Sequence, residues 1–207
     1  MTTEVPVTTP PEPSRVSTRL RIAKLAAGLA VLASAMYGGF CWYGHYRYPY
    51  GPSHSCIKVL GLALSNYADA HDGLFPIGEA TPEASLSLLA GYGLDFEVLR
   101  GKTVPADKVQ VRLAAGELLD AETCGWHYVE GLTTKDDPAL AIVWDKVGLG
   151  HNGERLSDGG HEVLFVDGSR RMVGGKDWSE FLNRQKELLA AREAAAKKAD
   201  LPTVSTP

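Results

Sequence analysis

The chain has 207 residues, of which 44% are apolar and 22% are charged, and its formal net charge at pH 7 is −4. These proportions are close to those of ordinary globular proteins and agree with one modest domain behind an anchor. Residues 1–24 carry four basic and two acidic side chains, so the rest of the chain is acidic as a group. An acidic domain lacks the basic face that nucleic-acid binding requires, and we expect no nucleic-acid partner.

Residues 1–22 are predicted to form a disordered cytoplasmic tail. Met1–Ser14 is rich in threonine and proline and contains almost no large apolar residue. Such a segment cannot bury enough apolar surface to offset the conformational entropy that folding removes.

An apolar segment follows, and the rest of the chain is organised around it. Leu25–Tyr43 contains nineteen residues without a charge. As a helix it would span about 28 Å, close to the thickness of a hydrocarbon core. We therefore predict a transmembrane helix over residues 23–45. Its anchoring side chains are predicted to be Leu25, Leu29, Leu32, Trp42 and Tyr43.

Basic residues flank this segment unevenly, with four just before it and two comparably close after it. They are Arg15, Arg19, Arg21 and Lys24 before it, and Arg47 and Lys58 after it. The positive-inside rule then places the N-terminus in the cytoplasm and the C-terminal domain in the periplasm or outside the cell. We expect the helix to lie in the inner (cell) membrane, with the lipid bilayer as one partner.

A cleaved secretion signal is the alternative to an anchor. Leu25–Ala33 would be its apolar region, and Ala33-Ser34-Ala35 has the small residues of a cleavage site. A retained anchor is favoured because the apolar run continues for eight residues beyond Ala35.

Residues 46–52 are predicted to be a linker, because Pro49 and Pro52 disfavour helical geometry in the residues before them. A second helix is predicted from Ser53 to Asp72, where apolar residues recur at three- and four-residue spacing. Gly73 is expected to end it as a C′ glycine.

A short helix is predicted at Thr81-Pro82-Glu83, which supplies an N-cap, a first-turn proline and an acidic residue near the positive end of the helix dipole. Residues 102–121 are ambiguous by pattern, with a possible strand at Val109–Leu113.

Short strands are predicted in the second half of the chain. Trp126–Val129 and Leu140–Trp144 are rich in aromatic and β-branched residues. Val163–Val166 and Ser169–Val173 flank Asp167-Gly168, a pair that favours a two-residue type I′ hairpin turn. A last helix is predicted over residues 177–200, followed by a disordered tail at 201–207.

The order of these pieces resembles a large group of bacterial pilin-like proteins of unknown function, which are themselves similar to type II secretion pseudopilins. The matching motifs are Cys56-Ile57-Lys58-Val59-Leu60 with Tyr67, Gly73-Leu74-Phe75-Pro76, Gly131-Leu132-Thr133, Val143-Trp144-Asp145-Lys146 and Val163-Leu164-Phe165-Val166-Asp167-Gly168-Ser169. The resemblance implies an α+β, pilin-like extracytoplasmic domain over residues 53–176, with an N-terminal helix and a small antiparallel sheet.

Two features of the group are altered or missing. Its C-terminal signature is H-x(9)-D-G, but Ser157 stands ten residues before Asp167, and the nearby histidine is His161. The G-F-T-L-x-E processing site that begins a true pilin is also missing, since Gly39-Phe40-Cys41 lies at the wrong end of the apolar run.

Two cysteines lie beyond the apolar segment, where thiols can oxidise. A disulfide between Cys56 and Cys124 would tie the second helix to the start of the sheet and would stabilise the fold by restricting the unfolded chain. The alternative is two buried free thiols.

Possible metal ligands form a loose group along the loops of the second half: Asp145, His151, Asp158, His161 and Asp167. No EF-hand spacing and no H-E-x-x-H helix organises them, and no nucleophile elbow or phosphate-binding loop is present. We therefore expect no catalytic residue, no cofactor and no metal.

The sequence favours a membrane-anchored structural or interaction subunit of an envelope or secretion assembly. We expect other envelope proteins as its partners, and we do not expect it to be an enzyme. The alternative is an extracytoplasmic metal-dependent enzyme that uses the loops from Asp145 to Asp167. The oligomeric state stays open.

Overall fold

The computed structural model describes residues 15–53 and 55–199, and the side chains of residues 19–53 and 55–198. Two compact units divide the chain, Met1–Gly44 and His45–Pro207, and we call the second the head unit. Residues 1–14 of the predicted N-terminal tail, and the whole predicted tail at 201–207, lie outside the described residues.

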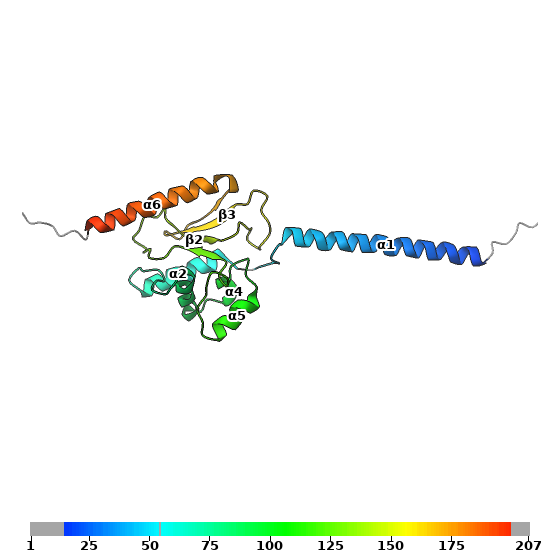
Figure 1. Ribbon diagram of the computed structural model, residues 1–207, viewed down its shortest axis with the longest axis horizontal. Helices are drawn as coiled ribbons and strands as arrows, with labels where there is room; N and C mark the ends of the chain where they lie inside the picture. The colour runs from blue at the N-terminus through cyan, green and yellow to red at the C-terminus, as the bar shows by residue number, and fades with distance from the viewer. Residues whose placement is uncertain (1–14, 54, 200–207) are drawn as a thin grey trace, which may run out of the picture. The chain divides into compact units, whose positions relative to one another are not determined.

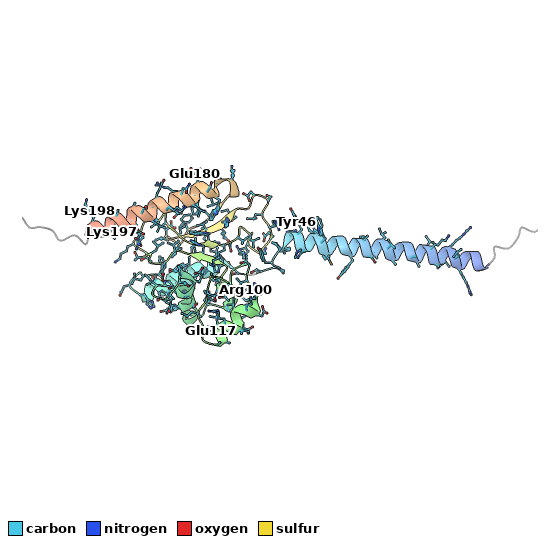
Figure 2. All side chains as sticks on the ribbon, in the orientation of Figure 1. Tyr46, Arg100, Glu117, Glu180, Lys197 and Lys198 are labelled. Atoms are coloured by element: carbon cyan, nitrogen blue, oxygen red, sulfur yellow. The ribbon has the colours of Figure 1, made fainter. Side chains whose placement is uncertain are left out.

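Helix α1 runs from Arg15 to Arg47 and contains the predicted transmembrane segment. Residues 15–22 are helical, so the prediction of a disordered tail was wrong for them. Extending an existing helix needs no new nucleation, and the arginine, leucine, alanine and lysine residues around Ile22 are good helix formers. Figure 2 shows the side chains of α1 projecting from both sides of the helix.

The sheet of the head unit has four antiparallel strands in the order β1-β2-β3-β4. They are β1 (Trp126–Tyr128), β2 (Ala141–Asp145), β3 (His161–Phe165) and β4 (Arg170–Val173). Each strand pairs with the next one along the chain; Val163, for example, lies between Trp144 of β2 and Arg171 of β4. The prediction of an α+β chain with a small antiparallel sheet and a C-terminal helix is confirmed at this level.

Helices cover both faces of the sheet, as Figure 1 shows. Helix α6 (Trp178–Ala199) lies over one face, where Phe181 packs against Phe165 of β3 with ring centroids 6.2 Å apart. Helix α2 (Ile57–Ala70) lies over the other face, in the same buried cluster as Leu164. Successive residues of a strand point to opposite faces, so Leu164 and Phe165 serve two different layers of the core.

Short helices fill the segment between α2 and β1. They are α3 (Pro82–Leu86), the 3₁₀-helix η1 (Ser87–Tyr92), α4 (Phe96–Leu99) and α5 (Ala106–Ala114), and a further 3₁₀-turn, η2 (Gly175–Asp177), precedes α6. Thr81 caps α3 as predicted, because its hydroxyl accepts a hydrogen bond of 3.2 Å from the backbone N–H of Ala84.

The possible strand at Val109–Leu113 is wrong, because these residues belong to α5. Val109 and Leu113 are four residues apart and share a helix face, with Val109 fully buried. Val111, which a strand would place on the same face as Val109, is 70% exposed. Pro105 immediately before the helix and Asp107 in its first turn also favour a helix start.

The turn between β3 and β4 contains Asp167 and Gly168 as predicted, but its type differs. Only Gly168 has a positive φ, of 78°, whereas a type I′ turn requires positive φ at both central residues. The N–H of Gly168 donates to the carbonyl of Phe165 at 2.9 Å, and Phe165 in turn donates to Ser169 at 2.9 Å. The loop therefore has three residues, Val166 to Gly168, and only its glycine is left-handed.

Two glycines bring distant backbone segments into contact beside the sheet. A Cβ atom on Gly125 would lie 2.6 Å from the carbonyl oxygen of Arg100, and one on Gly101 would lie 2.8 Å from the Cα of Gly125. The N–H of Gly125 donates to the same Arg100 carbonyl at 2.8 Å. This crossing places residue 102 against the interior of the head unit.

Replacing Gly125 with alanine is expected to destabilise the head unit by about 1–3 kcal/mol, because the backbone atoms at the crossing cannot move away without losing their hydrogen bond. Urea denaturation of the full chain in detergent measures the change. Gly91→Ala is the matched control, since no atom lies within 4 Å of its added Cβ. Equal stabilities of the two variants would contradict the role assigned to the crossing.

Candidate functional site

The predicted anchor residues all lie on the surface of α1. Leu25, Leu29, Leu32, Trp42 and Tyr43 are between 52% and 70% exposed. The part of α1 from Arg19 to Arg47 has 29 residues and a mean hydropathy of 1.5 in its most apolar window, none of which is buried. A helix of this length and composition is compatible with a membrane anchor, and a signal sequence has the same properties.

A charge centre lies inside the head unit, and we define it by Lys102, Asp145 and Glu162. The Lys102 ammonium donates to Oδ2 of Asp145 at 2.7 Å, and the two side chains are 0% and 1% exposed. Oε2 of Glu162 lies 3.8 Å from the same Nζ atom. The other oxygen of Glu162 pairs with Arg170 at 3.2 Å, so the charge centre reaches the surface through β4.

Three separate parts of the fold bring these groups together. Lys102 follows the glycine crossing between α4 and α5, where Gly101 has a φ of 70°. Asp145 is the last residue of β2, all of whose residues are buried. Glu162 is on the neighbouring strand β3. The ring of Trp126 from β1 completes the surroundings, with its centroid 5.9 Å from Nζ of Lys102.

Burial dominates the electrostatics of the charge centre. Removal from water raises the pKa of Asp145 to about 7, against the opposing effect of the Lys102 ammonium and with a further rise from the Glu162 charge. Oδ1 of Asp145 is buried and has no hydrogen-bond partner among the described residues. A buried carboxylate oxygen without a partner is unfavourable, and such groups are rare in folded proteins.

His161 lies next to the charge centre and has a structural environment. Its Nδ1 is 2.9 Å from the backbone carbonyl of Asp145, and its ring stacks on Trp178 with centroids 3.9 Å apart. Burial lowers the pKa of His161; the hydrogen bond to the Asp145 carbonyl opposes this effect, and the nearby Lys102 charge adds to it. The imidazole is therefore neutral at pH 7 and donates from Nδ1 to the carbonyl.

The residues predicted as possible metal ligands do not come together. Asp145 forms an ion pair with Lys102, and the ring of His161 stacks on Trp178. The other three residues, His151, Asp158 and Asp167, are exposed. Within residues 15–53 and 55–199, no group of three or more histidine, cysteine or acidic side chains is placed to hold a metal ion.

The two cysteines of the head unit are free thiols in the structure. Cys124 is buried, as the second predicted alternative requires, but Cys56 is not fully buried. Cys124 is buried, with its sulfur 3.7 Å from the carbonyl of Trp126 and 3.8 Å from that of Leu99. Burial raises the pKa of Cys124 to about 12. Cys56 lies at the N-cap of α2 and is half-buried.

We expect Cys124 to resist alkylation until the head unit unfolds, since the thiolate is the reactive form and burial suppresses it. Full-length protein carrying Cys41→Ala would be treated with iodoacetamide at pH 8 for increasing times, with and without urea, and digested for peptide mass mapping. Cys56 should react first in buffer, and both should react in urea. Equal rates in buffer, or a Cys56–Cys124 disulfide in the unreduced digest, would contradict this assignment.

A groove lies between the edge strand β4 and helix α6. Its volume is ≈380 Å³, and its apolar lining comes from Phe165, Met172, Val173, Phe181 and Leu188. The guanidinium of Arg171 lies 4.0 Å from the ring centroid of Phe165, and Arg184 and Asp177 also line the groove. The groove therefore combines an apolar floor with two arginines and one carboxylate.

The sequence predicted Asp145 as a possible metal ligand and as part of a family motif, but it did not indicate Lys102 or Glu162 as site residues. No local pattern marks Lys102, because its burial depends on the contact between Gly101 and Gly125, which are far apart in the chain. Alternation along β3 could have indicated that Glu162 and Leu164 share a strand face, but not which lysine Glu162 meets.

No family model, no curated protein and no solved structure matches this chain.

Proposed function

We propose that this chain is a single-pass membrane protein whose head unit acts outside the cytoplasm as a structural or interaction subunit of an envelope or secretion assembly. The observation that carries the proposal is α1, an apolar helix that is exposed throughout its candidate span and is attached to a separate compact unit. In water such a helix would expose a large contiguous apolar surface, which soluble monomers rarely do.

The proposed orientation rests on the charges beside the helix. The basic residues Arg19, Arg21 and Lys24 precede the apolar segment. Retaining them in the cytoplasm is the favoured topology for a single-pass helix. The head unit then lies in the periplasm or outside the cell.

The pilin-like part of the proposal rests on the motifs from Cys56 to Ser169 and is supported by the order of elements, a helix followed by a small antiparallel sheet. The missing processing site separates the proposed role from assembly of a classical pilus. A fixed subunit that holds other envelope proteins is the role that suits a retained anchor.

The groove between β4 and α6 is the surface on which we expect another envelope protein to dock. Its apolar floor suits an apolar segment, and Arg171 and Arg184 suit acidic side chains on that segment. Met172, on the exposed edge strand, is 56% exposed and lines this groove.

The metal-dependent enzyme is the less favoured function. It would need the side chains of His151, Asp158 and Asp167 to converge with Asp145, and Asp145 already pairs with Lys102.

Alkaline carbonate extraction of membranes, followed by the intact mass of the retained protein, tests the anchor. We expect the chain to stay in the pellet with residues 25–43 intact. A soluble chain that begins at Met36 would instead establish a cleaved signal and remove the membrane-assembly proposal.

Affinity purification of the full chain from detergent extracts tests the interaction role. We expect other envelope proteins to co-purify in fixed stoichiometry, and Met172→Asp to reduce their yield. Val111→Asp is the matched control, because Val111 is 70% exposed on α5, away from the groove. Loss of the partners in both variants, or in neither, would contradict the assignment of the groove.

A further inference from the structure

The charge centre is an unusual arrangement for a lysine and an aspartate. Both side chains are excluded from water, and Nζ of Lys102 lies 2.7 Å from Oδ2 of Asp145. The Oδ1 atom is buried with no hydrogen-bond partner among the described residues. Taking two charges out of water is expensive, and their attraction repays this only when the remaining polar atoms are also satisfied. As an ion pair, the charge centre is therefore incomplete.

We infer that Lys102 and Asp145 condense to form an intramolecular amide bond between Nζ and Cγ, with Glu162 as the catalytic residue that transfers the proton. Because Nζ contacts Oδ2, the carboxyl carbon is at most one carbon–oxygen bond length further away. The fold thus holds the two reacting groups against each other, which removes most of the entropic barrier to a reaction between them.

The first step is a proton transfer within the pair. The Lys102 ammonium gives one proton to the Asp145 carboxylate, which leaves a neutral amine beside a neutral carboxylic acid. An apolar interior favours the neutral forms over two separated charges. Burial acts in the same direction on Asp145, whose pKa it raises to about 7.

The second step forms the carbon–nitrogen bond. The amine lone pair attacks Cγ of Asp145, and the Glu162 carboxylate, whose Oε2 lies 3.8 Å from Nζ, accepts one amine proton. Glu162 then returns this proton to the departing hydroxyl group, the carbon–oxygen bond breaks, and water leaves. One amine and one carboxylic acid give one amide and one water, so no oxidant, cofactor or external reactant is required.

The surroundings of Glu162 suit this role. Arg170 holds one of its oxygens at 3.2 Å, which leaves the other directed toward Lys102. The Glu162 side chain is 15% exposed, so it connects the buried pair with the solvent into which the water is released. The amide product carries no charge and has one carboxyl-derived oxygen in place of two, so it leaves fewer buried polar atoms to satisfy than the ion pair does.

The bond would join two distant parts of the chain. Lys102 and Asp145 are 43 residues apart, in the segment before α5 and at the end of β2. Such a link cannot be reversed by reductants, whereas the free thiols of Cys56 and Cys124 provide no crosslink in this structure. The inference does not depend on the proposed function, since it concerns only the interior of the head unit.

Mass spectrometry of the full-length chain tests the inference directly. We expect an intact mass lower by one water than the sequence requires, and a branched tryptic peptide that joins Lys102 to Asp145. Trypsin should fail to cut after Lys102, because its side chain is no longer an amine. Lys108→Arg, at an exposed position, should keep the loss of water, whereas Lys102→Arg and Glu162→Gln should abolish it.

Loss of water can also arise from succinimide formation at Asp-Gly pairs, of which the chain has three, at Asp72, Asp158 and Asp167. The peptide map separates the two reactions, since a succinimide leaves Lys102 open to trypsin. A full intact mass, or a loss of water that maps to an Asp-Gly pair with normal cleavage after Lys102, would overturn the inference. This result needs only the wild-type chain and holds even if a variant fails to fold.

Discussion

Replacing Lys102 with methionine is expected to lower the free energy of unfolding of the head unit by at least about 3–5 kcal/mol at pH 8. Methionine fills much of the same space, so the main effect is to leave the buried Asp145 carboxylate without its cation. The variant also lacks any Lys102–Asp145 amide. In the chain-entropy model a crosslink over 43 residues adds about 4 kcal/mol, so the loss is larger if the amide forms.

This destabilisation should depend on pH. Lys102 holds the pKa of Asp145 down, so its removal raises that pKa further above about 7. Between the unfolded value of 3.8 and the raised folded value, the folded variant binds more protons than the unfolded chain. Its stability therefore falls as pH rises through this range, and the deficit should be smallest near pH 5 and largest above pH 8.

Urea denaturation of the full chain in detergent, at pH 5 and at pH 8, measures these changes in the free energy of unfolding. Lys108→Met, at an exposed position, is the matched control and should stay within about 0.5 kcal/mol of wild type. The double variant Lys102→Met with Asp145→Leu removes both charges and should recover the electrostatic part of the loss. A Lys102→Met variant as stable as wild type at pH 8 would contradict the description of the charge centre.

Replacing Leu29 and Leu32 together with arginine is expected to release the chain from membranes. Each arginine near the middle of a helix costs about 2.5–3.5 kcal/mol for insertion, and each lost leucine removes a further 0.3–0.6, roughly, so the total penalty is about 6–8 kcal/mol. Both side chains lie on the exposed surface of α1. The carbonate-resistant fraction of the protein, measured by immunoblot, gives the effect.

The controls for this variant introduce the same charge elsewhere. Leu62 of α2 and Val111 of α5 are exposed apolar residues of the head unit, and their replacement with arginine should leave the membrane fraction unchanged. A double-arginine chain that remains in the carbonate pellet would mean that the head unit, not α1, holds the protein on the membrane.

Local residue patterns predicted most of the helices and strands in which apolar residues recur at a regular spacing. The stripe of α2 and the strand pairs around Gly168 are consequences of side-chain spacing that the chain itself displays. The pattern failed in α5, where Val109, Val111 and Leu113 alternate as a strand would, although only Val109 is fully buried. There a preceding proline and a first-turn aspartate outweighed the alternation.

The charge centre could not be predicted in the same way. Lys102 looks like a solvated loop lysine in the sequence, and lysines are almost never fully buried unless they are paired. Its burial requires the backbone contact of Gly101 with Gly125 and the pairing of β2 with β3. These are long-range contacts, so no window of neighbouring residues contains the information.

The most direct test of the membrane-anchored account is to measure on which side of the membrane the head unit lies. In a chain with Cys41→Ala and Cys56→Ala, the remaining Cys124 is buried, and this chain serves as the unlabelled control. One new cysteine would be placed at Ser179, which is exposed on α6, or at Thr8 in the N-terminal segment. Intact cells or spheroplasts would then be treated with a membrane-impermeant maleimide. We expect Ser179→Cys to label without lysis and Thr8→Cys to label only after permeabilisation. A Ser179→Cys chain that stays unlabelled until the cells are lysed would place the head unit in the cytoplasm and contradict the account.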